Sequence, residues 1–239
     1  MPHNNYFKFK QFTVWQNRAA MRVGTDGVLL GAWASVENTE TALDIGTGTG
    51  VIALMLAQRC EATIHAIDIE PGAFNDASFN FSKSPWNNRL HAFSASLETF
   101  THTETATKYD TIVCNPPYFV NAKKPENANR KMARHTDSLS FAKLTYGAAH
   151  LLKPEGRFSV ILPIESERDF KIAASNAKLY LSRITRVKPN IAKAPKRVLM
   201  EFRFGHTQLS EHELTIETEQ RHVYTPEFSM LVKDFYLAL

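Results

Sequence analysis

Short apolar stretches alternate with helix-like stretches along most of this chain, and this alternation restricts the fold more than any other feature. The apolar stretches occupy residues 41–46, 62–68, 89–95, 109–114 and 157–163, and the helix-like ones occupy 51–60, 72–82, 138–152 and 167–179. Strands that alternate with helices favour βαβ units and a mostly parallel sheet with helices on both faces. We therefore predict an α/β fold.

The last third of the chain predicts one edge of that sheet and a terminal helix. Residues 180–189 and 196–205 are β-like and have no long helix between them, so we expect a seven-stranded sheet with an antiparallel edge pair. The tail after residue 211 is typical of one strand and one helix, which Thr225-Pro226-Glu227 would begin. No repeat or Gly/Ser linker divides the sequence, so we expect a single domain over residues 1–239.

The composition is that of an ordinary globular protein, with 44% hydrophobic and 22% charged residues. No run of about 18 uncharged apolar residues predicts a membrane span, and the N-terminal residues lack the pattern of a secretory signal. Cys60 and Cys114 lie in apolar contexts and no Cys/His cluster has metal-site spacing, so we expect reduced thiols, no metal and a cytoplasmic protein. The formal net charge of +4 permits a polyanionic partner without requiring one.

A glycine-rich segment, LDIGTGTG (43–50), follows the first strand of the alternating region and opens a helix. Glycines let a backbone turn tightly and approach a ligand closely. The spacing of Gly46, Gly48 and Gly50 is G-x-G-x-G, which differs from the G-x-G-x-x-G of dinucleotide sites. The segment therefore does not predict a pyrophosphate site.

An acid at the end of the next strand favours a nucleoside site instead. Asp68 lies about 20 residues after the second glycine, where a carboxylate can accept both hydroxyls of a ribose, and Ile69 would lie against an adenine. The alternative is a plain strand-to-helix turn that requires positive φ, with Asp68 as a helix cap before Pro71.

A rigid corner follows the fourth strand, at Asn115-Pro116-Pro117-Tyr118. Each proline fixes φ near −65° and has no N–H to donate, so the corner presents an amide, carbonyl oxygens and an aromatic face. Ligands of open α/β sheets bind at the carboxyl ends of the strands, which is where this corner lies. The alternative is an ordinary Pro-Pro turn that closes a strand.

In that order, LDIGTGTG (43–50), AIDIEP (66–71) and NPPY (115–118) resemble the class I S-adenosylmethionine-dependent methyltransferases. The NPPY form resembles enzymes that methylate a planar nitrogen, either adenine N6 or the N5 amide of a protein glutamine. Residues 12–33, 195–205 and 224–236 resemble the bacterial tRNA1(Val) adenine-N6-methyltransferases, which modify the adenosine just 3′ of the anticodon. The resemblance covers nearly the whole chain.

This resemblance implies a Rossmann-like class I methyltransferase fold, S-adenosyl-L-methionine as cofactor, and a set of cofactor residues. The expected cofactor residues are Thr25, Asp26, Asp44, Gly46, Gly48, Gly50, Asp68, Ile69, Ser96 and Leu97, with residues 1–40 as an extension that contributes to the site. The GTDG segment around Asp26 is also typical of an ordinary turn or helix cap. Related enzymes usually have an aspartate where Ser96 stands, and a hydroxyl would accept the same hydrogen bond from the adenine amino group without the charge.

The resemblance also gives the rigid corner a catalytic role. The N6 amino group of adenine is a poor nucleophile because its lone pair is delocalised, and acceptors aimed at its hydrogens favour the change toward sp³. The Asn115 side-chain oxygen and the Pro116 carbonyl are such acceptors, and Pro117 stiffens the corner. Tyr118 offers a face on which the base stacks.

Two basic stretches are candidates for contact with tRNA, the expected partner. We expect RNA contacts at Lys123, Lys124, Arg130, Lys131 and Arg134 in a mobile loop at 121–135, and at Lys196 and Arg197. The alternative is a solvated charged loop. Stacking of Trp15 or Trp86 on RNA is a weaker hypothesis than core packing.

Three other functions compete with tRNA methylation by a monomer. They are a protein glutamine N5-methyltransferase, an rRNA methyltransferase with the same corner, and a cofactor-binding module without catalysis. Only about 40 residues precede the glycine-rich segment, fewer than the separate helical domain that the glutamine enzymes normally carry would need.

Overall fold

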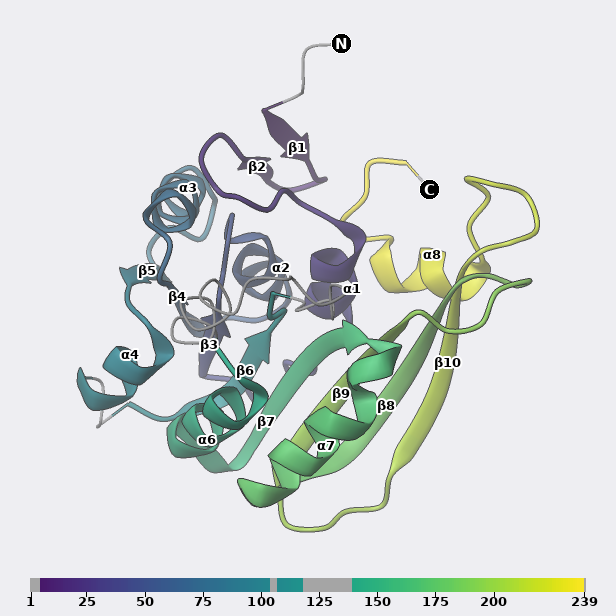
Figure 1. The fold of residues 1–239 in the computed structure, drawn as a ribbon. Coiled ribbons are helices and arrows are strands. Elements are labelled where there is room, and N and C mark those ends of the chain that lie inside the picture. The colour runs from purple at the N-terminus through teal and green to yellow at the C-terminus, as the bar shows by residue number, and fades with distance from the viewer. Residues whose placement is uncertain (1–4, 104–106, 118–138, 239) are drawn as a thin grey trace, which may run out of the picture.

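The computed structural model describes residues 5–103, 107–117 and 139–238. At the centre of the fold is one large sheet, which helices cover on both faces (Figure 1). In their order across the sheet, the described strands are β10 (Ser210–Glu217), β8 (Leu179–Asn190), β9 (Arg197–Phe204), β7 (Leu152–Pro163), β6 (Tyr109–Cys114), β3 (Thr41–Ile45), β4 (Thr63–Asp68) and β5 (Leu90–Ser94). Among them, β9 alone runs against the others. The predicted α/β class with a mostly parallel sheet is confirmed.

The predicted strand count and edge were wrong in detail. The main sheet has eight strands among the described residues rather than seven, and the antiparallel pair of β8 and β9 lies inside it, because β10 adds in parallel outside β8. Two cross-strand ion pairs help to hold this edge strand, Arg186 to Glu211 at 3.0 Å and Lys188 to Glu213 at 2.7 Å. The sequence predicted this strand but not the strand beside it, since the alternation of side chains shows which residues share a face and does not identify the neighbouring strand.

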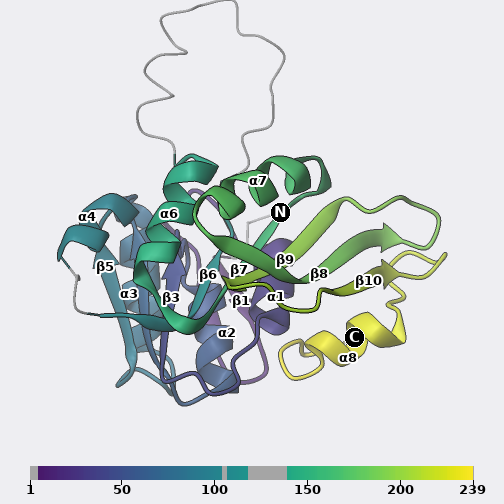
Figure 2. The same ribbon diagram turned by 90° about the horizontal axis from the view of Figure 1, so that it is seen from below.

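Seven described α-helices form two layers, which Figure 2 shows on either side of the sheet. One layer contains α1 (Thr25–Trp33), α2 (Val51–Arg59), α3 (Pro71–Ser82) and α8 (Pro226–Val232). The other contains α4 (Leu97–Thr103), α6 (Phe141–Leu151) and α7 (Glu167–Asn176), with the single turn η1 (Ile164–Ser166) before α7. The helix predicted over 72–82 begins one residue earlier, at Pro71, and the predicted start at Thr225-Pro226 is confirmed by the Thr225 side chain accepting from Phe228 N–H.

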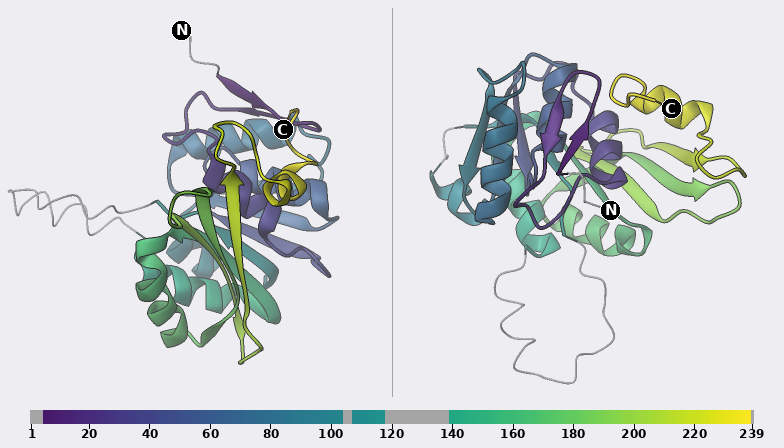
Figure 3. Two further views of the ribbon diagram at one scale, coloured as in Figure 1. Left: turned by 90° about the vertical axis from the view of Figure 1, so that its right-hand side faces the viewer. Right: turned by 90° about the horizontal axis from the view of Figure 1, so that it is seen from above.

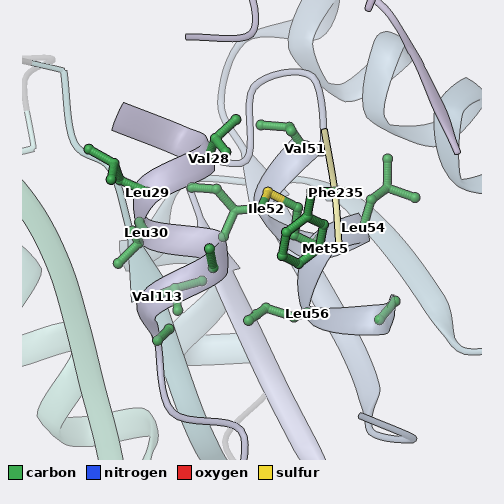
Figure 4. Packing of buried hydrophobic residues seen from close by; sticks show 14 of the residues in the cluster. Val28, Leu29, Leu30, Val51, Ile52, Leu54, Met55, Leu56, Val113 and Phe235 are labelled. Atoms are coloured by element: carbon green, nitrogen blue, oxygen red, sulfur yellow. The ribbon is translucent and has the colours of Figure 1, made fainter. Parts of the chain in front are cut away.

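Successive side chains of the inner strands point to opposite faces of the sheet, so the buried core forms two clusters, one on each face. In β3, Leu43 and Ile45 face the layer of α6 and α7, whereas Ala42 faces the layer of α1 and α2. Figure 4 shows part of the cluster on the side of α1 and α2, which contains residues of both helices together with Val113 of β6 and Phe235. Gly31 lets α1 approach α2 closely, because a Cβ there would lie 2.7 Å from the Met55 sulfur.

A small antiparallel hairpin, β1 (Tyr6–Lys8) and β2 (Thr13–Trp15), precedes α1. The hairpin lies near the C-terminal segment (Figure 3). The backbone N–H of Lys10, between its two strands, donates a hydrogen bond of 2.8 Å to the Phe235 carbonyl. None of the helices in the described ranges is long and apolar enough to cross a membrane.

Candidate active site at the carboxyl edge of the sheet

The parallel strands bring several predicted site residues to one edge. Ile45, the last residue of β3, pairs with Ile67 of β4 on one side and with Cys114 of β6 on the other. The glycine turn, Asp68 and Asn115 therefore begin where these three neighbouring strands end. This is the edge at which open α/β sheets bind ligands.

The three glycines of the turn all have positive φ, at 70°, 57° and 82° for Gly46, Gly48 and Gly50. Their surroundings differ. A Cβ on Gly46 or Gly48 would meet nothing within 4 Å, whereas one on Gly50 would lie 2.6 Å from the Phe81 ring of α3. Gly46 and Gly48 thus leave open space beside the backbone, while Gly50 is required for helix packing.

Asp44 lies beneath this turn and is fully buried. Its Oδ2 accepts from the Thr47 hydroxyl at 2.7 Å, and its Oδ1 is buried without a hydrogen-bond partner among the described residues. Burial raises the pKa of Asp44 to about 7, and the nearby charge of Asp68 adds to this effect. Sequence reasoning missed Thr47, although a hydroxyl three residues after an acid in a tight turn is a detectable signal.

Asp68 is fixed by two backbone donors. Gly48 N–H donates to its Oδ2 and Glu70 N–H to its Oδ1, both at 2.9 Å. Each oxygen retains acceptor capacity, since a carboxylate oxygen has two lone pairs. The cap of α3 is Glu70, whose side chain accepts from Gly72 and Ala73, rather than Asp68. Next to Asp68, the Ile69 side chain is 66% exposed.

The corner after β6 is described as far as Pro117, and Tyr118 lies outside the described residues. Asn115 is half-buried, Pro116 is buried and Pro117 is exposed. Burial raises the pKa of the Cys114 thiol well above its ordinary value, and the charges of Asp44 and Asp68 add to the shift. Cys114 is therefore a neutral packing residue and not a nucleophile.

Ser96 and Leu97 follow the end of β5, and their side chains have structural contacts. The Ser96 hydroxyl oxygen accepts from Thr99 N–H at 3.0 Å, in the manner of a helix cap for α4. Leu97 is buried in the core cluster of α4 and α6. The Leu97 side chain is therefore a packing residue.

Asp26 and Arg197 form one ionic unit, although the sequence assigned them to different partners. Arg197 Nε donates to Asp26 Oδ2 at 2.9 Å, joining the first turn of α1 to the start of β9. Arg197 lies opposite Pro163, the last residue of β7, and thus at the same edge of the sheet as the glycine turn. Thr25 and Lys196, which precede the two members of this pair in the sequence, are exposed.

Two polar residues of α3, both missed by the sequence analysis, attach the N-terminal extension to the site. The Asn80 side chain donates to the carbonyls of Trp15 and Thr49 and accepts from Trp15 N–H, each at 2.8 Å. Asp76 Oδ2 accepts from the backbone N–H groups of Arg18 and Ala19. Both side chains are buried, and their i,i+4 spacing on an apolar helix face is the signal that could have identified them.

The remaining predicted residues cannot be placed. Lys123, Lys124, Arg130, Lys131 and Arg134 lie outside the described residues. Within the described ranges, no group of three or more His, Cys, Asp or Glu side chains could hold a metal ion.

Comparison with known proteins agrees with this geometry. The model of the methyltransferase small domain family matches residues 24–163, which include α1, the glycine turn and the Asn115 corner. A tRNA1(Val) (adenine(37)-N6)-methyltransferase of Phocaeicola vulgatus is 49% identical over 234 residues, covering 98% of each chain. One of the same name from Christiangramia forsetii is 45% identical over 239 residues, covering 99% of each.

A solved structure supports the fold independently. A predicted O-methyltransferase from Agrobacterium tumefaciens superimposes with a TM-score of 0.70, covering 90% of this chain and 99% of that one, at 18% identity. At that identity the likeness concerns the fold alone. The family match and the near full-length relatives together show that this chain belongs to the tRNA1(Val) (adenine-N6)-methyltransferase family, with a methyltransferase small domain at its centre.

Proposed function

We propose that this protein transfers a methyl group from S-adenosyl-L-methionine to the N6 amino group of adenosine 37 of tRNA1(Val), directly 3′ of the anticodon. The observation that carries the proposal is the Asn115-Pro116 corner, which follows β6 beside the glycine turn of β3. Relatives with this named activity match the chain over almost its whole length.

The residues around the glycine turn fit this cofactor. Asp68 has acceptor capacity left for two ribose hydroxyls, and Ile69 presents an exposed apolar surface suited to an adenine ring. The unpartnered buried oxygen of Asp44 suits a cationic amino group or an ordered water. The open space at Gly46 and Gly48 would admit a ligand against the backbone. When bound, the cofactor supplies an electrophilic methyl group on a sulfonium.

Asn115 and Pro116 would act on the other reactant, the adenine amino group. The Asn115 side-chain oxygen and the Pro116 carbonyl would accept its two hydrogens, which favours pyramidal nitrogen and the positive charge that develops on it. Consecutive prolines limit the movement of these acceptors, so little reorganisation accompanies the reaction. Tyr118, the next residue in the sequence, would stack on the base.

The reaction needs no strongly basic side chain, because the methylated ammonium is acidic and loses its proton to water. Cys114, the reactive residue type closest to the corner, is buried and neutral. The roles of the protein would therefore be to orient the two reactants and to stabilise charge at the nitrogen.

For the tRNA, the basic residues between 121 and 135 remain the proposed phosphate contacts, with exposed Lys196 as a further one. Arg197 is better assigned to holding Asp26, since its Nε is bonded to that carboxylate. An adenosine in an unpaired loop reaches such a corner at small cost in unstacking. We place the enzyme as a monomer in the cytoplasm, where its substrate is found.

The test is incorporation of labelled methyl from S-adenosyl-L-methionine into tRNA that lacks this modification, followed by nucleoside analysis. The expected product is N6-methyladenosine at position 37 of tRNA1(Val). A tRNA transcript with guanosine at position 37 is the matched control and should take no label. Label in rRNA or in a release-factor glutamine, with none in tRNA, would leave the methyltransferase family intact and contradict the substrate.

A further inference from the structure

Three aromatic side chains form a partly exposed cluster where the N-terminal hairpin meets α3. Tyr6, Trp15 and Phe79 are 41%, 36% and 44% exposed. The ring centroids of Tyr6 and Trp15 are 5.2 Å apart, and those of Trp15 and Phe79 are 6.4 Å apart. Contiguous exposed apolar surface on a monomer often marks a binding site. Core packing was the stronger hypothesis from the sequence for both Trp15 and Trp86. It holds for Trp86, which packs on Phe12 at the core, and only in part for Trp15, which is 36% exposed.

Two lysines lie on the same surface. Lys8 is two residues after Tyr6 in β1, so both side chains are on the outer face of the hairpin, while Phe7 between them packs inward. Lys83 is one turn beyond Phe79, and its Nζ lies 5.8 Å from the Phe79 ring centroid. Neither lysine has an ion pair within the described ranges. The surface is thus both aromatic and cationic.

The net positive charge of the chain comes from residues 1–24, which supply Tyr6, Lys8 and Trp15 of this surface. Residues 1–24 contain Lys8, Lys10, Arg18 and Arg22 and no acidic residue, while the other 24 Lys and Arg are balanced by all 24 Asp and Glu. The nearest α3 carboxylate, Asp76, is buried and accepts from two backbone N–H groups. A polyanion would meet no acidic residue of this segment.

The surface is tied directly to the candidate active site. Asn80 bonds to Trp15 and also to Thr49 of the glycine turn, and Asp76 holds the chain at Arg18, between the hairpin and α1. Phe79 follows Pro71 by eight helical residues, which places it about 12 Å along α3 from the helix end beside Asp68. The surface therefore includes a residue of the helix that begins beside the candidate cofactor site.

We propose that the surface formed by Tyr6, Lys8, Trp15, Phe79 and Lys83 binds unpaired nucleotides of the anticodon loop that flank the methylated adenosine. The proposal rests on the proposed function. Bases stack on exposed aromatic rings with little regard to sequence, and lysines beside them pair with phosphates. The surface positions the RNA and takes no part in the chemical step.

The test compares two surface variants with two matched controls. Phe79→Ala and the double variant Lys8→Glu/Lys83→Glu alter the surface. Tyr146→Ala removes a ring that is 56% exposed on α6, in the opposite layer, and Lys178→Glu changes an exposed charge just before β8, which is one strand in from the β10 edge of the sheet. The probe is a fluorescent, unmodified anticodon stem-loop of tRNA1(Val), titrated with each protein over a range of salt concentrations.

Phe79→Ala should weaken stem-loop binding by about 5- to 140-fold, the range for loss of one stacked base. The lysine double variant should lower the slope of log affinity against log salt by about 1.4, as for two lost phosphate contacts to a single strand. Both controls should bind within about twofold of the wild type, and the KM for S-adenosyl-L-methionine should be unchanged in all four.

Equal RNA affinity in the surface variants and the controls would overturn the inference, provided that the wild type methylates tRNA. A rise in the KM for S-adenosyl-L-methionine in step with the loss of RNA binding would also overturn it, because the change would then act through α3 on Asp68. Loss of a dimer in Phe79→Ala with unchanged RNA affinity would assign the surface to a second copy of the chain. Absence of any tRNA methylation by the wild type is distinct, since it removes the proposed function itself.

Discussion

At the scale of single residues, glycines that are equivalent in the sequence have different roles in the structure. Gly46 and Gly48 face open space at the candidate cofactor site, and Gly50 faces Phe81. All three have positive φ, so the need for glycine follows from backbone conformation in each case. The sequence pattern identified the turn, but only the positions of neighbouring side chains distinguish a ligand-facing glycine from a packing one.

Gly48→Ala should weaken cofactor binding beyond its effect on stability. Alanine at this φ costs about 1–2 kcal/mol of stability, and its methyl group would occupy space proposed for the cofactor. Gly205→Ala is the matched control, because Gly205 has φ of 76° and likewise meets nothing within 4 Å. Calorimetric titration with S-adenosylhomocysteine should show affinity reduced about tenfold or more in Gly48→Ala only. Equal affinities in the two variants would contradict the site.

Asp44 should make stability depend on pH. Burial raises its pKa from 3.8 to about 7, so between these values the native protein holds a proton that the unfolded chain has released. Its contribution to the free energy of unfolding therefore falls by up to about 1.4 kcal/mol per pH unit as pH rises through this window. In Asp44→Asn, the free energy of unfolding measured with urea at about pH 5.5 and 7.5 should lack this fall. If the free energy of unfolding changes equally with pH in the variant and the wild type, Asp44 is not the source of the pH dependence.

At the scale of elements, the Asp26–Arg197 pair joins α1 to β9 across the site edge. Both side chains are partly exposed, so the pair should add less than about 1 kcal/mol of stability. We propose that Arg197 orients Asp26 toward the candidate cofactor site. The sequence could not reveal this pairing, because 171 residues separate its members.

A double-mutant cycle tests that role for Arg197. Asp26→Asn and Arg197→Met should each raise the KM for S-adenosyl-L-methionine by about 3- to 10-fold, and the double variant should be no worse than the poorer single variant. Steady-state kinetics with both substrates varied would measure this. If the variants instead raise only the KM for tRNA, and the two effects add in the double variant, the result would support contact of Arg197 with RNA.

The helices and strands themselves were largely predictable. Glu70-Pro71 and Thr225-Pro226 mark helix starts because a capping side chain precedes a proline at the first helical position. The position of β10 was not predictable, since Leu214 is its single buried apolar residue and ion pairs to β8 contribute to its pairing. Pairing partners depend on tertiary contacts rather than on local pattern.

At the scale of the whole molecule, distant segments converge on one edge of the sheet. Sequence motifs identified the glycine turn, Asp68 and Asn115, and parallel strand order explains why they meet. The hydrogen bonds of Asn80 and Asp76 to the N-terminal extension were missed, because the spacing of these two side chains on α3 does not show which remote segment they contact. These bonds connect the basic first 24 residues to the site that α3 borders.

The central claim is that this edge binds S-adenosyl-L-methionine and that the Asn115 corner carries out transfer to adenine N6. The most direct measurement is single-turnover methyl transfer to unmodified tRNA1(Val) by Asn115→Ala, together with its affinity for S-adenosylhomocysteine. We predict affinity within about threefold of the wild type and a transfer rate lower by about 100-fold or more, as when one preorganised hydrogen-bond group is removed from a catalytic site. A rate near that of the wild type, or a loss of affinity that accounts for the whole loss of rate, would contradict the claim.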